Sequence, residues 1–392
     1  MRLFRYLMIT ASLGLGATSA TAGNYSIAGL AQKNSSSSAN YTASGLAQKN
    51  MTYTTLANVT AALAGGAAPG YNGVGSLFVS YASTATTHFG SLCTGSLLNS
   101  NTVLTAAHCI FDHDEEGNAD PVTGITFFLP SFGAYGTAGS VTIDASDWAF
   151  NPLYDTADHT GDIGSGHDVG IFTLSEAATG YQTYDIYGGD PLQQFTEVGT
   201  GTIGGPRGTD QGTTDDYLKR TGTNEYELYG DWLFSDVTHG VLLADFDDGT
   251  AAHDVFGRNL GLDGLGVVGE SNSSPGDSGG PEFIDGKIAT VTSFGITGGI
   301  FDGFCGGTST DPYNSSGTTA VKSLSSCTNS SVGEIAGNTR VDYNLDFING
   351  YLRDHGEAAE AVPESATWAL MLGGFGLIGA TMRRRRAAVS FG

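Results

Sequence analysis

Short runs in which apolar and polar residues alternate begin near Leu77 and recur to about Tyr343. Alternation with a period of two residues predicts β-strands that have one buried face. Two of these runs, within residues 283–288, are separated by Asp285-Gly286, a dipeptide that suits a tight hairpin turn with positive φ at both central positions. The pattern predicts an all-β architecture over roughly two-thirds of the chain.

A different period at the end of this region predicts a helix. Apolar residues recur there at helical spacing: Val341, Leu345, Ile348 and Leu352. This spacing places their side chains on one face of an α-helix. We therefore expect a short helix to close the domain, followed by a polar, alanine-rich linker at residues 354–361.

The N-terminus carries an apolar run of another kind. Arg2 and Arg5 precede it, and small residues follow it at Ala20 to Ala22. This order is typical of a secretory signal peptide, so we expect signal peptidase to remove residues 1–22 and the protein to be exported.

Residues 23–70 are rich in alanine, serine, threonine and asparagine, and the sequence of residues 29–34 recurs at residues 45–50. Two copies are too few for a solenoid. A segment of this composition has little apolar surface to bury, so we expect a pro-segment or a flexible stalk.

The C-terminal region, residues 362–386, combines Val362-Pro363-Glu364, an apolar stretch from Ala366 to Met382, and four arginines. It resembles a PEP-CTERM sorting signal, with the departure that Ser365 stands where the motif usually has a second proline. The apolar stretch is marginal for spanning a bilayer, and the arginines would hold its end at the cytoplasmic side. The resemblance implies transient membrane anchoring, removal of the tail by an exosortase-type enzyme, and a location in the cell envelope or outside the cell. A plain transmembrane anchor is the alternative.

The charge of the chain excludes one class of partner. There are 40 Asp and Glu against 16 Lys and Arg, which gives a net charge of −24 at pH 7. Nucleic acid, a polyanion, would be repelled. Acidic runs at residues 112–116 and 245–249 are candidates for calcium, but neither has the spacing of an EF-hand loop. We assign no metal and no cofactor.

Three segments carry the residue types of nucleophilic acyl transfer. Ser278 lies within residues 273–281, where flanking glycines let backbone amides converge on an oxyanion. His108 lies in residues 104–109, and Asp168 comes directly before an apolar run. In sequence and in the order His, Asp, Ser, the segments resemble those of the trypsin/chymotrypsin-like serine proteases and differ in order from subtilisin and the α/β-hydrolases.

The resemblance implies two Greek-key β-barrels within residues 71–353, split near residue 190, with the site at their interface. It implies a secreted serine endopeptidase that acts on proteins or peptides, with Ser278 as nucleophile, His108 as general base and Asp168 as the residue that orients the imidazole. The amides of Gly276 and Ser278 would bind the oxyanion.

Alternatives remain for the acid and for the activity. Asp162 lies only six residues before Asp168, whereas we expect His167 to be an ordinary surface residue. A catalytically silent protein of this fold, used for binding at a surface or matrix, is the rival interpretation. The presence of all three triad residues and the oxyanion glycines favours the enzyme.

The resemblance also implies a disulfide between Cys93 and Cys109. Four cysteines in an oxidising compartment favour two bridges, and the pairing that we favour adds Cys305 to Cys327.

Substrate-binding residues follow from the same resemblance. Ser293, Phe294 and Gly295 resemble the edge that pairs with the substrate backbone, and Asn272 resembles the residue at the floor of the specificity pocket. A neutral amide offers no counter-charge to a substrate Arg or Lys, so we expect a preference that is not strictly for these residues. Glu270 or a residue of the loop 296–305 could supply charge from another direction.

Asp277, next to the predicted nucleophile, needs a partner because an unpaired buried carboxylate is costly. The Ile-Val-Gly-Gly sequence that supplies a new N-terminus in the animal enzymes is absent from this chain. We expect an arginine in its place, with three candidates: Arg207, Arg258 and Arg340. The alternative is that residues 23–70 are removed and the new N-terminus inserts.

Overall fold

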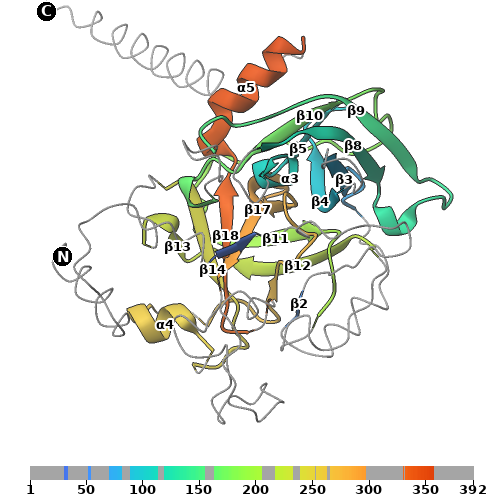
Figure 1. The fold of residues 1–392 in the computed structure, drawn as a ribbon. Coiled ribbons are helices and arrows are strands. Elements are labelled where there is room, and N and C mark those ends of the chain that lie inside the picture. Colours follow the sequence, from blue (N-terminus) through green and yellow to red (C-terminus); the bar gives the residue numbers. More distant parts are fainter. Residues whose placement is uncertain are drawn as a thin grey trace, which may run out of the picture. The chain divides into compact units, whose positions relative to one another are not determined.

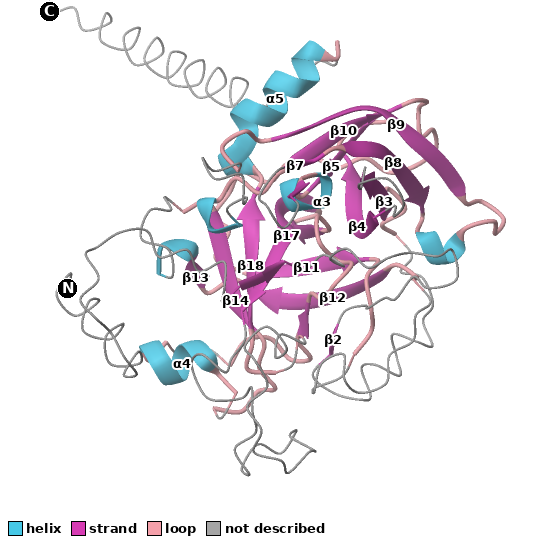
Figure 2. Cartoon of the chain, viewed as in Figure 1, coloured by secondary structure: helices cyan, strands magenta, loops and turns pink. Residues whose placement is uncertain are grey.

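A computed structural model describes twelve stretches of the chain. They are residues 31–33, 52–53, 70–81, 89–113, 119–154, 163–204, 217–232, 239–251, 253–262, 265–296, 330 and 332–356. Strands dominate the described part (Figure 2). The chain divides into two units, residues 1–345 and residues 346–392, and both sheets belong to the first unit.

The first sheet is a closed six-stranded barrel with the strand order β10-β5-β4-β3-β8-β9 (Figure 1). Its strands are β3 (Val74–Tyr81), β4 (Phe89–Leu97), β5 (Thr102–Thr105), β8 (Val122–Leu129), β9 (Val141–Phe150) and β10 (Gly170–Leu174). Between them lie α3 (Ala107–Ile110), β6 (Asp112–His113), β7 (Ala119–Asp120) and the 3-10 turns η2 (Phe132–Ala134) and η3 (Ile163–Ser165).

Alternating residues of these strands fill the barrel. In β8, Ile125, Phe127 and Leu129 are buried, as the period of two predicts. The rings of Phe127 and Phe172 meet edge to face, with centroids 5.9 Å apart. Because every strand has a neighbour on both sides, the barrel has no open edge.

The second sheet has the order β12-β11-β16-β17-β18-β14-β13 and curls into an open half-barrel (Figure 1). Its strands are β11 (Gln194–Gly199), β12 (Arg220–Glu225), β13 (Leu228–Tyr229), β14 (Val241–Asp245), β16 (Pro281–Ile284), β17 (Lys287–Ile296) and β18 (Ile335–Arg340). The turn η5 (Gly230–Trp232), the helix α4 (Val255–Leu260) and the short strand β15 (Ser271–Asn272) lie in its connections.

The hairpin predicted at residues 283–288 is confirmed. Strands β16 and β17 pair antiparallel, and the turn residues Asp285 and Gly286 have φ of 52° and 75°. Positive φ at both positions is the requirement that selects an Asp-Gly pair. This hairpin directly follows the predicted nucleophile and fixes the end of its loop.

The predicted helix is present as α5 (Leu345–Asp354), which follows the 3-10 turn η8 (Asp342–Asn344). It begins four residues later than the apolar period suggests, because Val341 precedes that tighter turn. The predicted fold class, two β-barrels followed by a short helix, is confirmed in a form in which the second barrel is an open half.

Several predicted features lie outside the described residues: residues 1–22 and 362–386, Cys305, Cys327, Asp162 and Arg207. Within the described stretches, no helix has the length and apolar character needed to cross a membrane.

Candidate active site

The loop that carries Ser278 connects β15 to β16 and depends on glycine. Gly276 and Gly279 have φ of 102° and 75°, which side chains rarely tolerate. A Cβ at Gly279 would also collide with the side chain of Thr105 and the carbonyl of Thr94. The loop is a series of tight turns, in which the amide of Asp277 donates to the Ser274 carbonyl at 2.9 Å.

The first barrel is hydrogen-bonded to this loop through Thr94 of β4. The Thr94 amide donates to the carbonyl of Ser278 at 2.8 Å, and its hydroxyl donates to the carbonyl of Gly276 at 2.9 Å. The same hydroxyl lies 2.9 Å from that of Thr200. One residue therefore orients two peptide groups of the predicted oxyanion loop. Sequence reasoning did not assign Thr94 a role, and its position next to Cys93 is the only signal it offered.

His108 and Asp168 are brought together in the buried junction between the sheets. Nδ1 of His108 lies 2.7 Å from Oδ2 of Asp168, and the His108 amide donates to Oδ1 at 2.8 Å. Ser293 of β17 donates its hydroxyl to the same Oδ2. Burial raises the pKa of Asp168. The His108 charge and the hydrogen bonds from His108 and Ser293 lower this pKa by more than burial raises it, so the net pKa lies below its usual value.

Ser278 is placed on the loop beside this pair. Its side chain is fully buried, and among the described residues neither its Oγ nor Nε2 of His108 has a hydrogen-bond partner. In enzymes without substrate this contact is often long and tightens when substrate binds. The structure thus joins the predicted acid to the predicted base and leaves the base–nucleophile hydrogen bond unmade.

The disulfide between Cys93 and Cys109 is present, with an S–S distance of 2.10 Å. It joins β4, which carries Thr94, to α3, which carries His108. The bridge closes a loop with a sequence separation of 16 residues, a constraint worth roughly 3 kcal/mol in the chain-entropy model.

His167, expected to be an ordinary surface residue, is half-buried and structural. Its ring stacks on Tyr343, and its Nδ1 lies 3.0 Å from Oδ1 of Asn344. It therefore ties the segment before Asp168 to the residues that follow β18.

Asp277 finds its partners mainly in the backbone. Oδ1 accepts from the Gly201 amide at 2.8 Å, and Oδ2 accepts from the Ser274 amide at 2.9 Å. Burial raises its pKa to about 7, against the lowering effect of these bonds and of the Arg220 charge. The charge that acts on it thus comes from an arginine that sequence reasoning did not name.

None of the three arginines proposed from the sequence is seen to pair with Asp277 in the described residues. Arg340 binds Asp342 through Nε at 2.9 Å, so it serves another carboxylate. Arg207 lies outside the described residues, as does the side chain of Arg258.

Two further acids, Glu197 and Glu282, are buried in the same sheet. Glu282 accepts from the hydroxyls of Thr290 and Thr292. Burial first, and then the neighbouring Asp277 charge, raise the pKa of each to about 8. Together with Asp277, they form a group of three buried carboxyl groups that repel one another when charged.

The predicted substrate-binding residues lie on two strands. Asn272 belongs to β15 and is buried, while Ser293, Phe294 and Gly295 belong to β17. Phe294 is fully buried, and its ring packs in an apolar cluster with Val241, Leu243 and Ile335. Its ring is therefore part of the core, and only its backbone lies at the edge of the strand.

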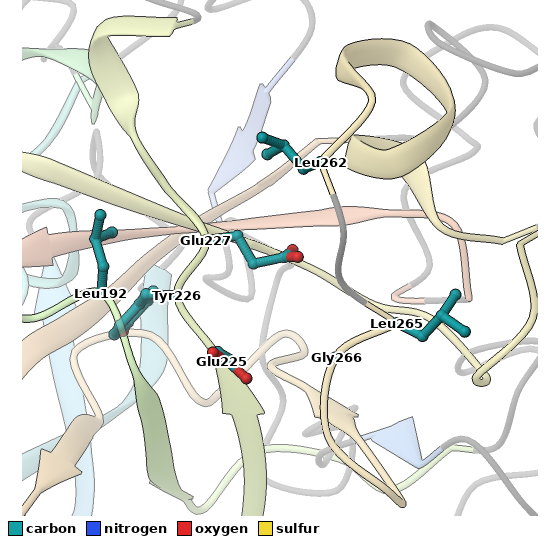
Figure 3. A pocket seen from close by; sticks show the side chains of 7 residues that line it. All are labelled: Leu192, Glu225, Tyr226, Glu227, Leu262, Leu265 and Gly266. Carbon is teal, nitrogen blue, oxygen red and sulfur yellow. The ribbon is translucent and has the colours of Figure 1, made fainter.

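A pocket of about 560 Å³ lies elsewhere on the second sheet, where its walls include Glu225, Tyr226, Glu227, Leu262 and Leu265 (Figure 3). Burial and the neighbouring Asp245 raise the pKa of Glu227 to about 10. None of the predicted triad residues lines this pocket.

Potential metal ligands converge at one point in the described part of the chain. Cys93, His108 and Cys109 offer atoms within 4.8 Å of one another, but the two sulfurs are joined in the disulfide. The acidic run at residues 245–249 forms no such group within the described stretches. Its Asp247 instead accepts from the Gly249 amide at 2.6 Å.

A model of the trypsin family matches residues 68–221, which include His108 and Asp168. No curated protein matches the chain. The match supports a trypsin-like serine protease, a peptidase whose substrates are proteins or peptides.

The buried acids predict a pH-dependent stability. A carboxyl group whose pKa is raised from 4.5 to about 8 binds its proton more tightly in the folded than in the unfolded state. The free energy of unfolding should therefore fall as the pH rises from about 4.5 to about 8. We expect Glu282→Gln to make this fall shallower in urea titrations at pH 5 and pH 8.

The matched control is Asp285→Asn, which removes a carboxylate from the exposed turn of the same hairpin. It should keep the slope of the parent. If the free energy of unfolding changed equally with pH in the parent and in Glu282→Gln, Glu282 would not be an acid with a raised pKa.

Proposed function

We propose that this protein is an exported serine endopeptidase that cleaves peptide bonds through Ser278, His108 and Asp168. The observation that carries the proposal is the Asp168–His108 pair, with 2.7 Å between carboxylate and imidazole in a fully buried junction. A carboxylate that accepts from Nδ1 leaves the basic lone pair on Nε2, as a general base requires.

The chemistry follows from these roles. Nε2 of His108 takes the hydroxyl proton of Ser278 while Oγ bonds to the peptide carbonyl carbon, and the carbonyl electrons move to the oxygen. The amides of Gly276 and Ser278 stabilise that oxyanion. The C–N bond then breaks, the leaving amine takes the proton from His108, and water releases the acyl group by the same steps in reverse order.

Support for the oxyanion site comes from Thr94. Thr94 donates to the carbonyls of Gly276 and Ser278, and it therefore holds in place the two residues whose amides we propose as oxyanion donors. Preorganised amides cost no rearrangement when charge develops on the substrate oxygen.

The nucleophile is tested by labelling with a fluorophosphonate probe. We expect one label on Ser278, no label in Ser278→Ala, and in Asp168→Asn a turnover lower by about 10⁴, because the imidazole adopts the wrong tautomer. The experiment is done on the full chain and on material from which residues 23–70 have been removed. Failure of both forms to label would overturn the proposal and favour the catalytically silent binding protein.

The specificity is proposed to differ from strict cleavage after Arg or Lys. Asn272 carries no charge, and Glu270 is turned away: its carboxylate accepts from the amides of Asp247 at 2.8 Å and Val267 at 2.9 Å. Burial and the neighbouring Asp247 raise the pKa of Glu270 to about 9, so at neutral pH it offers little counter-charge.

A peptide-library digest read by mass spectrometry measures this preference. We expect neutral residues to dominate the position before the cleaved bond. Dominant cleavage after Arg or Lys would contradict the assignment of Asn272, while Asn272→Asp should shift cleavage toward basic residues.

Export and sorting are proposed from the two ends of the chain. Signal peptidase would remove residues 1–22, and an exosortase-type enzyme would recognise residues 362–386 after transient membrane anchoring. Intact mass spectrometry of protein from the cell envelope and medium should show both losses. A product that keeps the four C-terminal arginines would support a plain membrane anchor instead.

A further inference from the structure

The end of β17 has a neighbouring strand from residues 194–340 on only one of its two edges. The neighbouring strand β16 pairs with β17 only from Lys287 to Val291, whereas β18 follows the opposite edge to Ile296. Residues 293–296 therefore present backbone donors and acceptors that another strand can use. This stretch includes Ser293, Phe294 and Gly295, the predicted substrate-binding residues.

A piece of the N-terminal region fills that edge. Strand β1 (Ala31–Lys33) pairs antiparallel with β17, with Gln32 opposite Gly295 and Lys33 opposite Phe294 (Figure 1, dark blue). The next residue of β17 in this direction is Ser293, whose hydroxyl binds Asp168. Residues 31–33 thus run in the direction of Ser293, as an extended peptide bound for cleavage would.

A second piece pairs with the other substrate-binding strand. Strand β2 (Thr52–Tyr53) lies antiparallel to β15, with Thr52 opposite Asn272. In the same structure Ser278 is 0 % exposed and His108 is 3 % exposed. The predicted nucleophile and base are therefore both buried in the structure in which these two strands are paired.

We propose that the N-terminal region is an intramolecular, substrate-like inhibitor whose residues 31–33 occupy the β17 edge until it is displaced or removed. The inference rests on the proposed function, since it assigns the regulation of that site. It also gives a role to the pro-segment expected from the sequence: the strand that fills the edge lies within the first copy of the duplicated sequence, residues 29–34.

The duplication supplies a matched control. Two adjacent prolines, Ala31→Pro with Gln32→Pro, remove a backbone donor whichever of the two residues faces β17. The same change in the second copy, Ala47→Pro with Gln48→Pro, alters an identical sequence outside the described pairing. In the full chain, we expect the first variant to react with a fluorophosphonate about tenfold faster than the parent, because it loses one or two hydrogen bonds. The second should react as the parent does.

Equal labelling rates in the parent and the first variant would overturn the inference while the proposed function stands. Complete absence of labelling in every form would instead overturn the function, so a second measurement keeps the inference testable. In the Ser278→Ala background, hydrogen exchange should show those amides of residues 293–296 that face β1 protected in the parent and exposed in the first proline variant, while the amides that face β18 stay protected in both. Unchanged protection there would also overturn the inference.

Discussion

A single buried carboxylate, Asp168, connects the three segments on which the site depends. It precedes β10 of the closed barrel, binds the amide and ring of His108 on α3, and accepts from Ser293 on β17 of the other sheet. Burial alone would disfavour its charge, and the donors around it more than offset that cost. His108 belongs to the first barrel and Ser293 to the second sheet. Asp168 can therefore orient the imidazole only when the two sheets are packed in this relative position.

A second connection joins Thr94 of the first barrel to the Ser278 loop of the second sheet. Thr94 donates to two carbonyls of the Ser278 loop, and the Cys93–Cys109 bridge ties the same strand to the helix that carries His108. The base and the nucleophile loop are therefore positioned by adjacent residues of β4. Two buried acids of this region, Asp277 and Glu282, are costly to ionise, since burial raises the pKa of each.

The sequence predicts those parts of this arrangement that have a local signature. Alternation predicts the strands, the Asp285-Gly286 pair predicts its hairpin, and the motifs around His108 and Asp168 predict two residues that the structure joins. The partners of Asp277 escaped prediction because backbone amides leave no signature in a sequence. Thr94 escaped for a related reason: its contacts lie more than 100 residues away along the chain, and no period or spacing records them.

The open edge of β17 shows how one constraint serves two purposes. A protease of this kind must leave a strand edge unpaired, because main-chain pairing is how an extended substrate is held. The same unpaired edge invites any other strand, including one from a second molecule, and is a risk until the protein reaches its place of action. A covering strand from the same chain has a high effective concentration at this edge, so it can win that competition with few contacts. β1, which pairs with residues 294–296, is a strand of this kind.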